Sequence, residues 1–247
     1  MYFFNLVNFK NIPLLRIKSY STGRSQGRIT VNHRSAGSRF NFVNQFNMDT
    51  PLNCLSQVYS IIKRPLQPDL YISIFETGFI GLFLSPNSLS KGEFVLNSLS
   101  PLPVKFGNTM PLKFIPVGSR VYNVEKIART AGVSIQVLRH KTGKTLCRLP
   151  SSELKWFSSQ LLSTVGVLSN SDRRFYKFYK AGQLRWLGRR PTTRGTAMNP
   201  IDHPHGGGQG KTSGGRPSVS PTARLTKGYR TVRTKRNKNI FKTRYAK

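Results

Sequence analysis

The excess of positive charge is the feature that most constrains how this chain can fold. The sequence contains 40 Lys and Arg against 8 Asp and Glu, which gives a formal net charge of +32 over 247 residues. A compact monomer with that excess repels itself, so the charge indicates a polyanionic partner. The apolar fraction of 37%, which includes 16 Phe, is too high for a wholly disordered basic tail. We therefore expect that part of the chain folds.

The charge is unevenly distributed along the chain. No acidic residue precedes Asp49, whereas seven Lys and Arg do. Residues 49–172 hold seven of the eight acids and thirteen bases. From Arg173 onward there are twenty bases and a single acid, Asp202. This distribution predicts a nearly ordinary central body with a cationic arm on each side.

Several other classes of protein receive no support from the sequence. Cys54 and Cys147 are far apart, so neither a disulfide framework nor a CxxC metal site is indicated. No stretch approaches the roughly twenty apolar residues of a membrane span. The start of the chain, "MYFFNLVNFKNIPLLRIKSYSTGR", is basic and free of acids, as mitochondrial targeting segments are. We expect thiols in a reducing compartment and no contact with a membrane.

The first half of the central body contains short apolar runs separated by turn residues. Residues 71–75, 78–84 and 92–96 are rich in aromatic and branched side chains and are bounded by Pro, Gly, Asn and Ser. The proline-rich stretch 100–119 follows, and its prolines argue against a helix or a central strand. We interpret it as a linker between two small β units.

The second half shows the same pattern of short strands. The segments 134–140 and 145–150 are expected to be short strands joined by "KTGK", a turn sequence, and "ELKWF" (153–157) alternates as a half-buried strand does. Residues 172–184 are expected to form one or two helical turns. Regularly spaced short strands are typical of small barrels or sandwiches, so the predicted fold is mostly β. After Arg189 the periodicity ends, and such a segment needs a partner to acquire a shape.

The stretch "NPIDHPHGGGQGKTSGG" (199–215) could be a nucleotide-binding loop. Gly210, Lys211 and Thr212 match the end of a P-loop, but its first glycine would fall on His205. The motif also requires a buried strand before it and a helix after it. Prolines precede this loop and "SGGRP" follows it, so we do not expect a nucleotide hydrolase.

A metal site or close contact with RNA are the other interpretations of this stretch. Asp202, His203 and His205 could ligate a metal, but a site needs three or four ligands with a supporting shell, and the surroundings are cationic. Glycines allow backbone amides to approach phosphates and riboses, and imidazoles hydrogen-bond or stack on bases. Neighbouring arginines supply the charge that dominates affinity for phosphate. We favour RNA contact, with no metal, no cofactor and no enzymatic activity.

Residues 182–221, "GQLRWLGRRPTTRGTAMNPIDHPHGGGQGKTSGGRPSVSP", closely resemble the signature of the universal large-subunit ribosomal protein two family. The resemblance continues in "GRSQGRITVNHR" (23–34), "KFGNTMPLKFIPVGSRVYNVE" (105–125) and "IARTAGVSIQV" (127–137). It is weakest at about 40–100. Where the family has glycines this chain has Ser35 and Ala36, and where the family has Glu it has Gln209.

The resemblance implies a fold and an organisation of domains. Residues 1–27 would be a basic extension, 28–112 an OB-fold-like RNA-binding domain, 113–188 an SH3-like barrel, and 189–247 a basic rRNA-binding extension. The family also implies a structural role in the large ribosomal subunit near the peptidyl transferase centre, with support for subunit association, tRNA binding and translation. An RNA chaperone or a ribosome assembly factor remains the alternative.

The partners implied are large-subunit rRNA, other ribosomal proteins and the small subunit across the subunit interface. The many Phe and Asn residues predict a diverged, organelle-encoded form in the mitochondrial matrix, with a plastid or a bacterial cytoplasm as alternatives. The RNA-binding residues carried over by the resemblance or expected from charge are Arg24, Arg28, His33, Arg34, Arg185, Trp186, Arg189, Arg190, Arg194, Met198, Asn199, His203, His205, Gly206, Gly207, Gly208, Lys211, Arg216, Lys227, Arg230, Arg233, Lys235 and Arg236.

Overall fold

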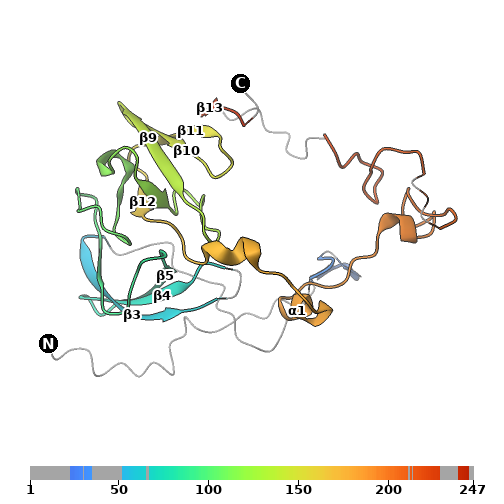
Figure 1. Cartoon of the computed structure of the whole chain (residues 1–247), viewed down its shortest axis with the longest axis horizontal. Coiled ribbons are helices and arrows are strands. Elements are labelled where there is room, and N and C mark those ends of the chain that lie inside the picture. Colours follow the sequence, from blue (N-terminus) through green and yellow to red (C-terminus); the bar gives the residue numbers. More distant parts are fainter. Residues whose placement is uncertain are drawn as a thin grey trace. The chain divides into compact units, whose positions relative to one another are not determined.

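The computed structural model describes residues 23–29, 31–34, 52–64, 67–210, 212, 214–228 and 239–244. The chain divides into two compact units (Figure 1). We call the first the β unit, which includes Asn41–Lys177 and Asn237–Lys247, and the second the loop unit, which comprises Ser19–Phe40 and Phe178–Arg236. In the part of the chain that the structure describes, no helix has the length and apolar character needed to cross a membrane.

The β unit is built on one sheet with the order β13-β11-β10-β9-β8-β12-β7-β6-β3-β4-β5. Neighbouring strands are antiparallel except β6 and β7, which meet in parallel at Asn97 and Thr109. The prediction of a mostly β fold is thereby confirmed. The strands are β3 (Cys54–Ile62), β4 (Leu70–Phe75), β5 (Ile80–Leu84), β6 (Phe94–Asn97), β7 (Thr109–Pro111), β8 (Arg120–Tyr122), β9 (Ile135–Lys141), β10 (Lys144–Arg148), β11 (Leu154–Ser158), β12 (Leu162–Val165) and β13 (Ile240–Lys242).

Strand β4 is buried on both faces, which explains why its sequence "LYISIF" is apolar except for Ser73. Leu70 and Ile72 belong to the larger hydrophobic cluster, which extends through Met110 and the second half of the unit. Tyr71 and Phe75 point to the opposite face and form a smaller cluster around Val58 and Val95. Successive side chains of β4 thus pack alternately into two hydrophobic clusters.

Contacts outside the sheet ladder also join the two halves of the β unit. The hydroxyl of Tyr122 in β8 donates a hydrogen bond to the carbonyl of Leu84 in β5 over 3.1 Å. The backbone N–H of Asp69 donates to the hydroxyl of Ser169 over 2.7 Å. The N–H of Ser169 in turn donates to the carbonyl of Ser85 over 3.1 Å. These contacts fix the strand ends against each other in addition to the shared core.

The prediction that 100–119 is only a linker is wrong for Thr109–Pro111. These three residues form β7, which lies between β12 and β6 and is buried. Pro111 is tolerated because it is the last residue of the strand, and the pairing continues when the N–H of Leu112 donates to the carbonyl of Leu161 over 3.0 Å. Met110 is fully buried, so its truncation to Ala is expected to cost about 2–5 kcal/mol. The 3-10 turn η3 (Leu112–Phe114) follows.

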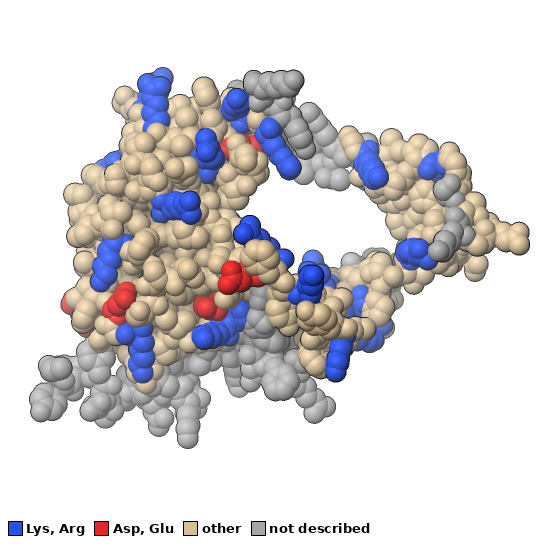
Figure 2. All heavy atoms as spheres, viewed as in Figure 1, with Lys and Arg blue, Asp and Glu red and all other residues tan. Residues whose placement is uncertain are grey.

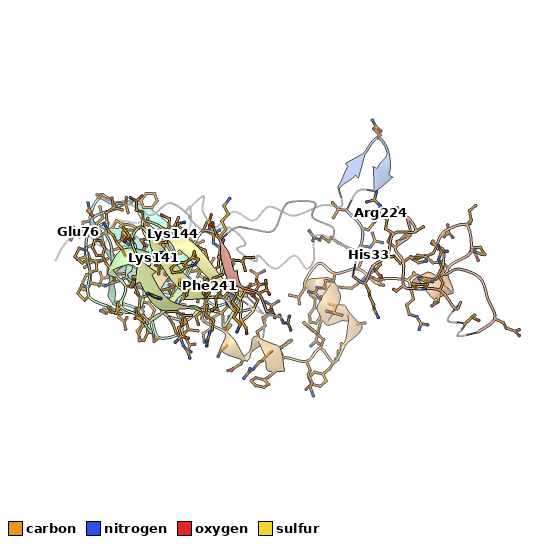
Figure 3. All side chains as sticks on the ribbon, turned by 90° about the horizontal axis from the view of Figure 1, so that it is seen from above. His33, Glu76, Lys141, Lys144, Arg224 and Phe241 are labelled. Atoms are coloured by element: carbon orange, nitrogen blue, oxygen red, sulfur yellow. The ribbon has the colours of Figure 1, made fainter. Side chains whose placement is uncertain are left out.

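The predicted turn "KTGK" is confirmed as a two-residue hairpin between β9 and β10. Lys141 pairs with Lys144, and Gly143 has a φ of +72°, which side chains other than glycine rarely adopt. Figure 3 labels the two lysines at this hairpin. The strand predicted at 153–157 is also present as β11, where Phe157 is the buried side chain and the ring of Trp156 meets that of Phe241 in β13 edge to face, with centroids 6.2 Å apart.

The loop unit contains little regular structure in its described residues. It has the short hairpin of β1 (Arg24–Ser25) and β2 (Arg28–Ile29), the helix α1 (Ala181–Trp186) and the 3-10 turn η5 (Gly195–Ala197). Together with η4 (Ser171–Phe175) in the β unit, α1 confirms the helical turns predicted from "DRRFYKFYKAGQL". The shape of the loop unit therefore depends on turns and on hydrogen bonds between loops.

Candidate nucleic-acid interface

The two segments with the signature sequences meet inside the loop unit. Arg34 and Arg189 form an isolated antiparallel β-bridge. The N–H of Arg190 donates to the carbonyl of His33 over 3.0 Å, and Nδ1 of His33 lies 3.0 Å from the carbonyl oxygen of Pro191. His33, which Figure 3 labels, has a φ of +60°. Residues predicted separately to bind RNA are thus brought together from positions more than 150 residues apart.

None of the residues of helix α1 is buried, so packing does not stabilise it. Hydrogen bonds at its two ends do. The side-chain carbonyl of Gln183 accepts hydrogen bonds from the N–H groups of Tyr179 at 2.9 Å and Lys180 at 3.4 Å. At the other end Gly188, with a φ of +80°, donates to the carbonyl of Arg185 over 2.9 Å. Trp186 remains 57% exposed on this small frame, so its indole is accessible to a partner.

Two histidine rings organise the loop 195–207. The N–H of His205 donates to Nδ1 of His203 over 3.0 Å, and the N–H of Val219 donates to Nε2 of His205 over 3.0 Å. The two rings stack with centroids 5.1 Å apart and planes 22° apart. His203 is buried and His205 is half-buried. We call this arrangement the histidine clasp.

The histidine clasp assigns a tautomer to both rings. A backbone N–H can only donate, so Nδ1 of His203 and Nε2 of His205 act as acceptors. In this tautomer the ring N–H of each histidine is on the other nitrogen. The N–H that remains on the half-buried ring of His205 is Nδ1–H, which makes Nδ1 a donor to a partner.

Close backbone contacts explain two of the glycines in this loop. A Cβ on Gly206 would lie 2.2 Å from the carbonyl oxygen of Asn199, and a Cβ on Gly195 would lie 2.6 Å from Cε1 of His203. The N–H of Gly207 donates to the carbonyl of Met198 over 3.0 Å, and that of Gly206 to the carbonyl of His203 over 2.8 Å. The loop thus folds on itself, and at these positions the protein's own atoms occupy the space of a side chain.

Exposed Arg and Lys residues occur in the sequence on both sides of the residues that form these loop contacts. Within the described residues none of them makes an ion pair, so their charges are available to a polyanion. These exposed residues are Arg34, Arg185, Arg189, Arg190, Arg194, Arg216 and Lys227. Figure 2 shows Lys and Arg side chains spread over the visible face of the molecule, with few acidic ones among them.

The remaining predicted site residues take various positions. Met198 is half-buried, whereas Asn199, Gly207 and Gly208 are exposed. For Arg24 and Arg28 the structure describes the backbone of the β1–β2 hairpin, whose turn places Gln26 at a φ of +50° and Gly27 at +74°. Outside the described residues lie Lys211, Arg230, Arg233, Lys235 and Arg236.

Sequence reasoning missed residues whose role depends on distant contacts. Val219 is buried and supplies the N–H that holds His205, and Gln183 caps α1. An apolar residue within the polar run "RPSVSP" was the available signal for Val219. In the described part of the chain, no group of three or more His, Cys, Asp or Glu could hold a metal ion.

Comparison with known proteins identifies the family. The family model for the C-terminal domain of ribosomal proteins L2 matches residues 105–223. A mitochondrial protein of Reclinomonas americana, large ribosomal subunit protein uL2m, is 40% identical over 92% of this chain and 85% of its own length. The chain belongs to the uL2 family.

Bacterial members of the uL2 family are similar to a comparable degree. The uL2 protein of a Hydrogenobaculum species is 39% identical over 94% of this chain and 86% of its own length. That of Rickettsia akari is 40% identical over 92% of this chain and 86% of its own length. The resemblance found in the sequence motifs is thereby confirmed. Because the relatives include mitochondrial and bacterial proteins, they are consistent with a location of this chain in the ribosome of an organelle or a bacterium.

Proposed function

We propose that this uL2-family chain is a structural component of the large ribosomal subunit that binds large-subunit rRNA near the peptidyl transferase centre. It supports subunit association, tRNA binding and translation, and it contacts other ribosomal proteins and the small subunit. The observation that carries the proposal is the histidine clasp, which folds a loop of the family signature on itself. Exposed cations that make no ion pair among the described residues lie on both sides of that loop in the sequence.

The loop unit is suited to RNA because it combines fixed donors with unneutralised charge. The guanidinium groups of Arg190 and Arg194 are exposed and supply the electrostatic attraction to phosphates. The Nδ1–H of His205, the amide of Asn199 and the exposed indole of Trp186 offer hydrogen bonds and a stacking surface to bases and riboses. The arginines would position the RNA backbone, and the groups that contact bases and riboses would select a particular RNA fold.

We also propose the finer organisation that the family implies. Residues 28–112 would act as an OB-fold-like domain and 113–188 as an SH3-like barrel, with basic extensions at 1–27 and 189–247. The location proposed is the mitochondrial matrix, because the many Phe and Asn residues favour a diverged, organelle-encoded form and one relative is a mitochondrial uL2m. The predicted site residues outside the described part are included as phosphate contacts.

A sucrose gradient at high salt tests the proposed function. A structural component is expected to stay with assembled large subunits, whereas an RNA chaperone or an assembly factor would be released or would appear only with precursor particles. Binding of the isolated chain to rRNA fragments should also weaken with salt, with a log–log slope of roughly −0.7 to −0.9 per phosphate contacted. Release from mature subunits, or an affinity independent of salt, would contradict the proposal.

A further inference from the structure

A pocket of about 550 Å³ in the β unit is lined by three arginines and a single acid. Arg120 comes from β8, Arg173 and Arg174 come from η4, and Asp172 is the acid. Ala131 and Gly132 also line the pocket, and a Cβ on Gly132 would lie 2.6 Å from Cα of Ser171. Close backbone packing therefore holds η4 against the loop before β9.

The guanidinium groups of this pocket are not neutralised by the protein. All three arginines are exposed, and within the described residues none of them makes an ion pair or a hydrogen bond through its side chain. Asp172 accepts a hydrogen bond from the hydroxyl of Ser171 over 3.3 Å. Three cations against one carboxylate around one concavity leave an excess positive charge, which an anion would relieve.

Two exposed aromatic residues follow the arginines of the pocket in the sequence. Phe175 is 65% exposed and Tyr176 is 55% exposed. The guanidinium carbon of Arg174 lies 4.6 Å from the centroid of the Phe175 ring, a cation–π contact that orders both groups. Solvent-exposed aromatic side chains beside cations form the stacking platforms on which unpaired bases bind.

We propose that the pocket of Arg120, Arg173 and Arg174 binds a phosphate of an unpaired RNA segment, and that a neighbouring base stacks on Phe175. This inference rests on the proposed rRNA binding and assigns to the β unit a contact separate from the histidine clasp. An unpaired strand is required because bases in a duplex do not offer their faces to an aromatic ring. Asp172 provides an acceptor for a ribose 2′-hydroxyl, which favours RNA over DNA.

Photo-cross-linking of the full chain to a thiouridine-containing oligouridylate of about ten nucleotides tests the assignment. Cross-links are expected at Phe175 or Tyr176 in addition to those in the loop unit. The double variant Arg120→Gln with Arg173→Gln should reduce the Phe175 and Tyr176 cross-links roughly ten-fold, because contacts to phosphate dominate the affinity. Phe175→Leu, which keeps an apolar side chain but loses the aromatic face, should reduce the cross-links at the neighbouring Tyr176 to a similar extent.

A matched control removes the same charge elsewhere on the β unit. Lys141→Gln with Lys144→Gln, at the exposed turn between β9 and β10, should leave the Phe175 and Tyr176 cross-links unchanged. Suppose that cross-links in the loop unit persist, but those at Phe175 and Tyr176 are absent or do not respond to the arginine substitutions. This result would overturn this inference and leave the proposed function intact. A Phe175 that cross-links to protein in purified ribosomes would also overturn it. Absence of cross-links from both units would instead count against the proposed function.

Discussion

The backbone N–H of His205 donates a hydrogen bond to Nδ1 of His203 over 3.0 Å, and the two imidazole rings stack with centroids 5.1 Å apart. Because Val219 in turn donates to Nε2 of His205, the two rings connect residues on both sides of the glycine run. The two imidazoles therefore hold the backbone of this loop through hydrogen bonds. Each of these hydrogen bonds is accepted by one particular ring nitrogen.

Matched substitutions can separate the two ring nitrogens. The oxygen of Asn takes the place of Nδ1 and the oxygen of Gln takes the place of Nε2. His203→Asn and His205→Gln should therefore preserve the loop, whereas His203→Gln and His205→Asn should each lose one hydrogen bond, about 1 kcal/mol or a roughly five-fold faster local exchange. Hydrogen exchange at the amides of His205 and Val219 measures this. Equal effects of Asn and Gln at both positions would refute the assigned acceptors.

The histidines are predicted to support structure and not to act as a general base. Ribosomes assembled with His205→Gln should form peptide bonds at nearly the native rate, while His205→Ala should mainly reduce assembly or subunit joining. Single-turnover peptidyl transfer across pH on purified, fully assembled ribosomes measures the difference. A rate lowered by several orders of magnitude, with loss of a titration near neutrality, would show that His205 takes part in acid–base catalysis.

Gly206 is predicted to tolerate no side chain because backbone atoms fill the space. A Cβ there would lie 2.2 Å from the carbonyl oxygen of Asn199, so Gly206→Ala must displace the turn at a cost of about 1–3 kcal/mol. Faster exchange of the Gly207 amide and weaker binding to rRNA fragments are expected. Gly182→Ala is the control, since no atom lies within 4 Å of a Cβ at this position in α1. Similar behaviour of the two variants would contradict the steric account.

The buried thiol of Cys147 is predicted to lower the free energy of unfolding as pH rises into the alkaline range. Burial raises the pKa of Cys147 to about 12 from the ordinary value of 9.0. Between these two values the unfolded chain loses a proton that the folded chain keeps, so stability is fully present below pH 9.0 and falls as pH rises. The Cys147 contribution is at most about 1.4 kcal/mol per pH unit.

Urea unfolding at several pH values between 9 and 12 measures this contribution. Cys147→Ala should flatten the decline, because the substitution removes the buried thiol. Burial also raises the pKa of Tyr71 and Tyr122, so part of the decline should remain in this variant. An identical slope in the native chain and in Cys147→Ala would exclude the thiol as a source.

The sequence predicts strands that have a clear local signal and misses those whose strand character comes from their neighbours. β4 is mostly apolar, and β9 contains branched residues and leads directly into a turn sequence. In β3 the polar residues Ser56 and Gln57 are adjacent, so its sequence shows neither an apolar run nor a strict alternation, and β7 lies among prolines. Both therefore depend on the strands beside them. β13 has three residues and is recruited by β11 from far along the chain.

The candidate site shows the same division between local and distant information. Composition and the family signature singled out His203 and His205 as functional. Their acceptor roles could not be predicted, because the donor to His205 is the amide of Val219, fourteen residues away in an irregular segment. Likewise, the bridge between Arg34 and Arg189 depends on tertiary structure that local propensity does not encode.

Cross-linking within assembled ribosomes tests the central claim most directly. Ultraviolet irradiation of purified large subunits, followed by identification of the linked peptides and nucleotides, should join the segment from Arg185 to Arg216 to large-subunit rRNA near the peptidyl transferase centre. The segment from Arg24 to Arg34 should be linked to neighbouring rRNA. Links from Arg185–Arg216 only to protein, or to rRNA remote from that centre, would contradict the account.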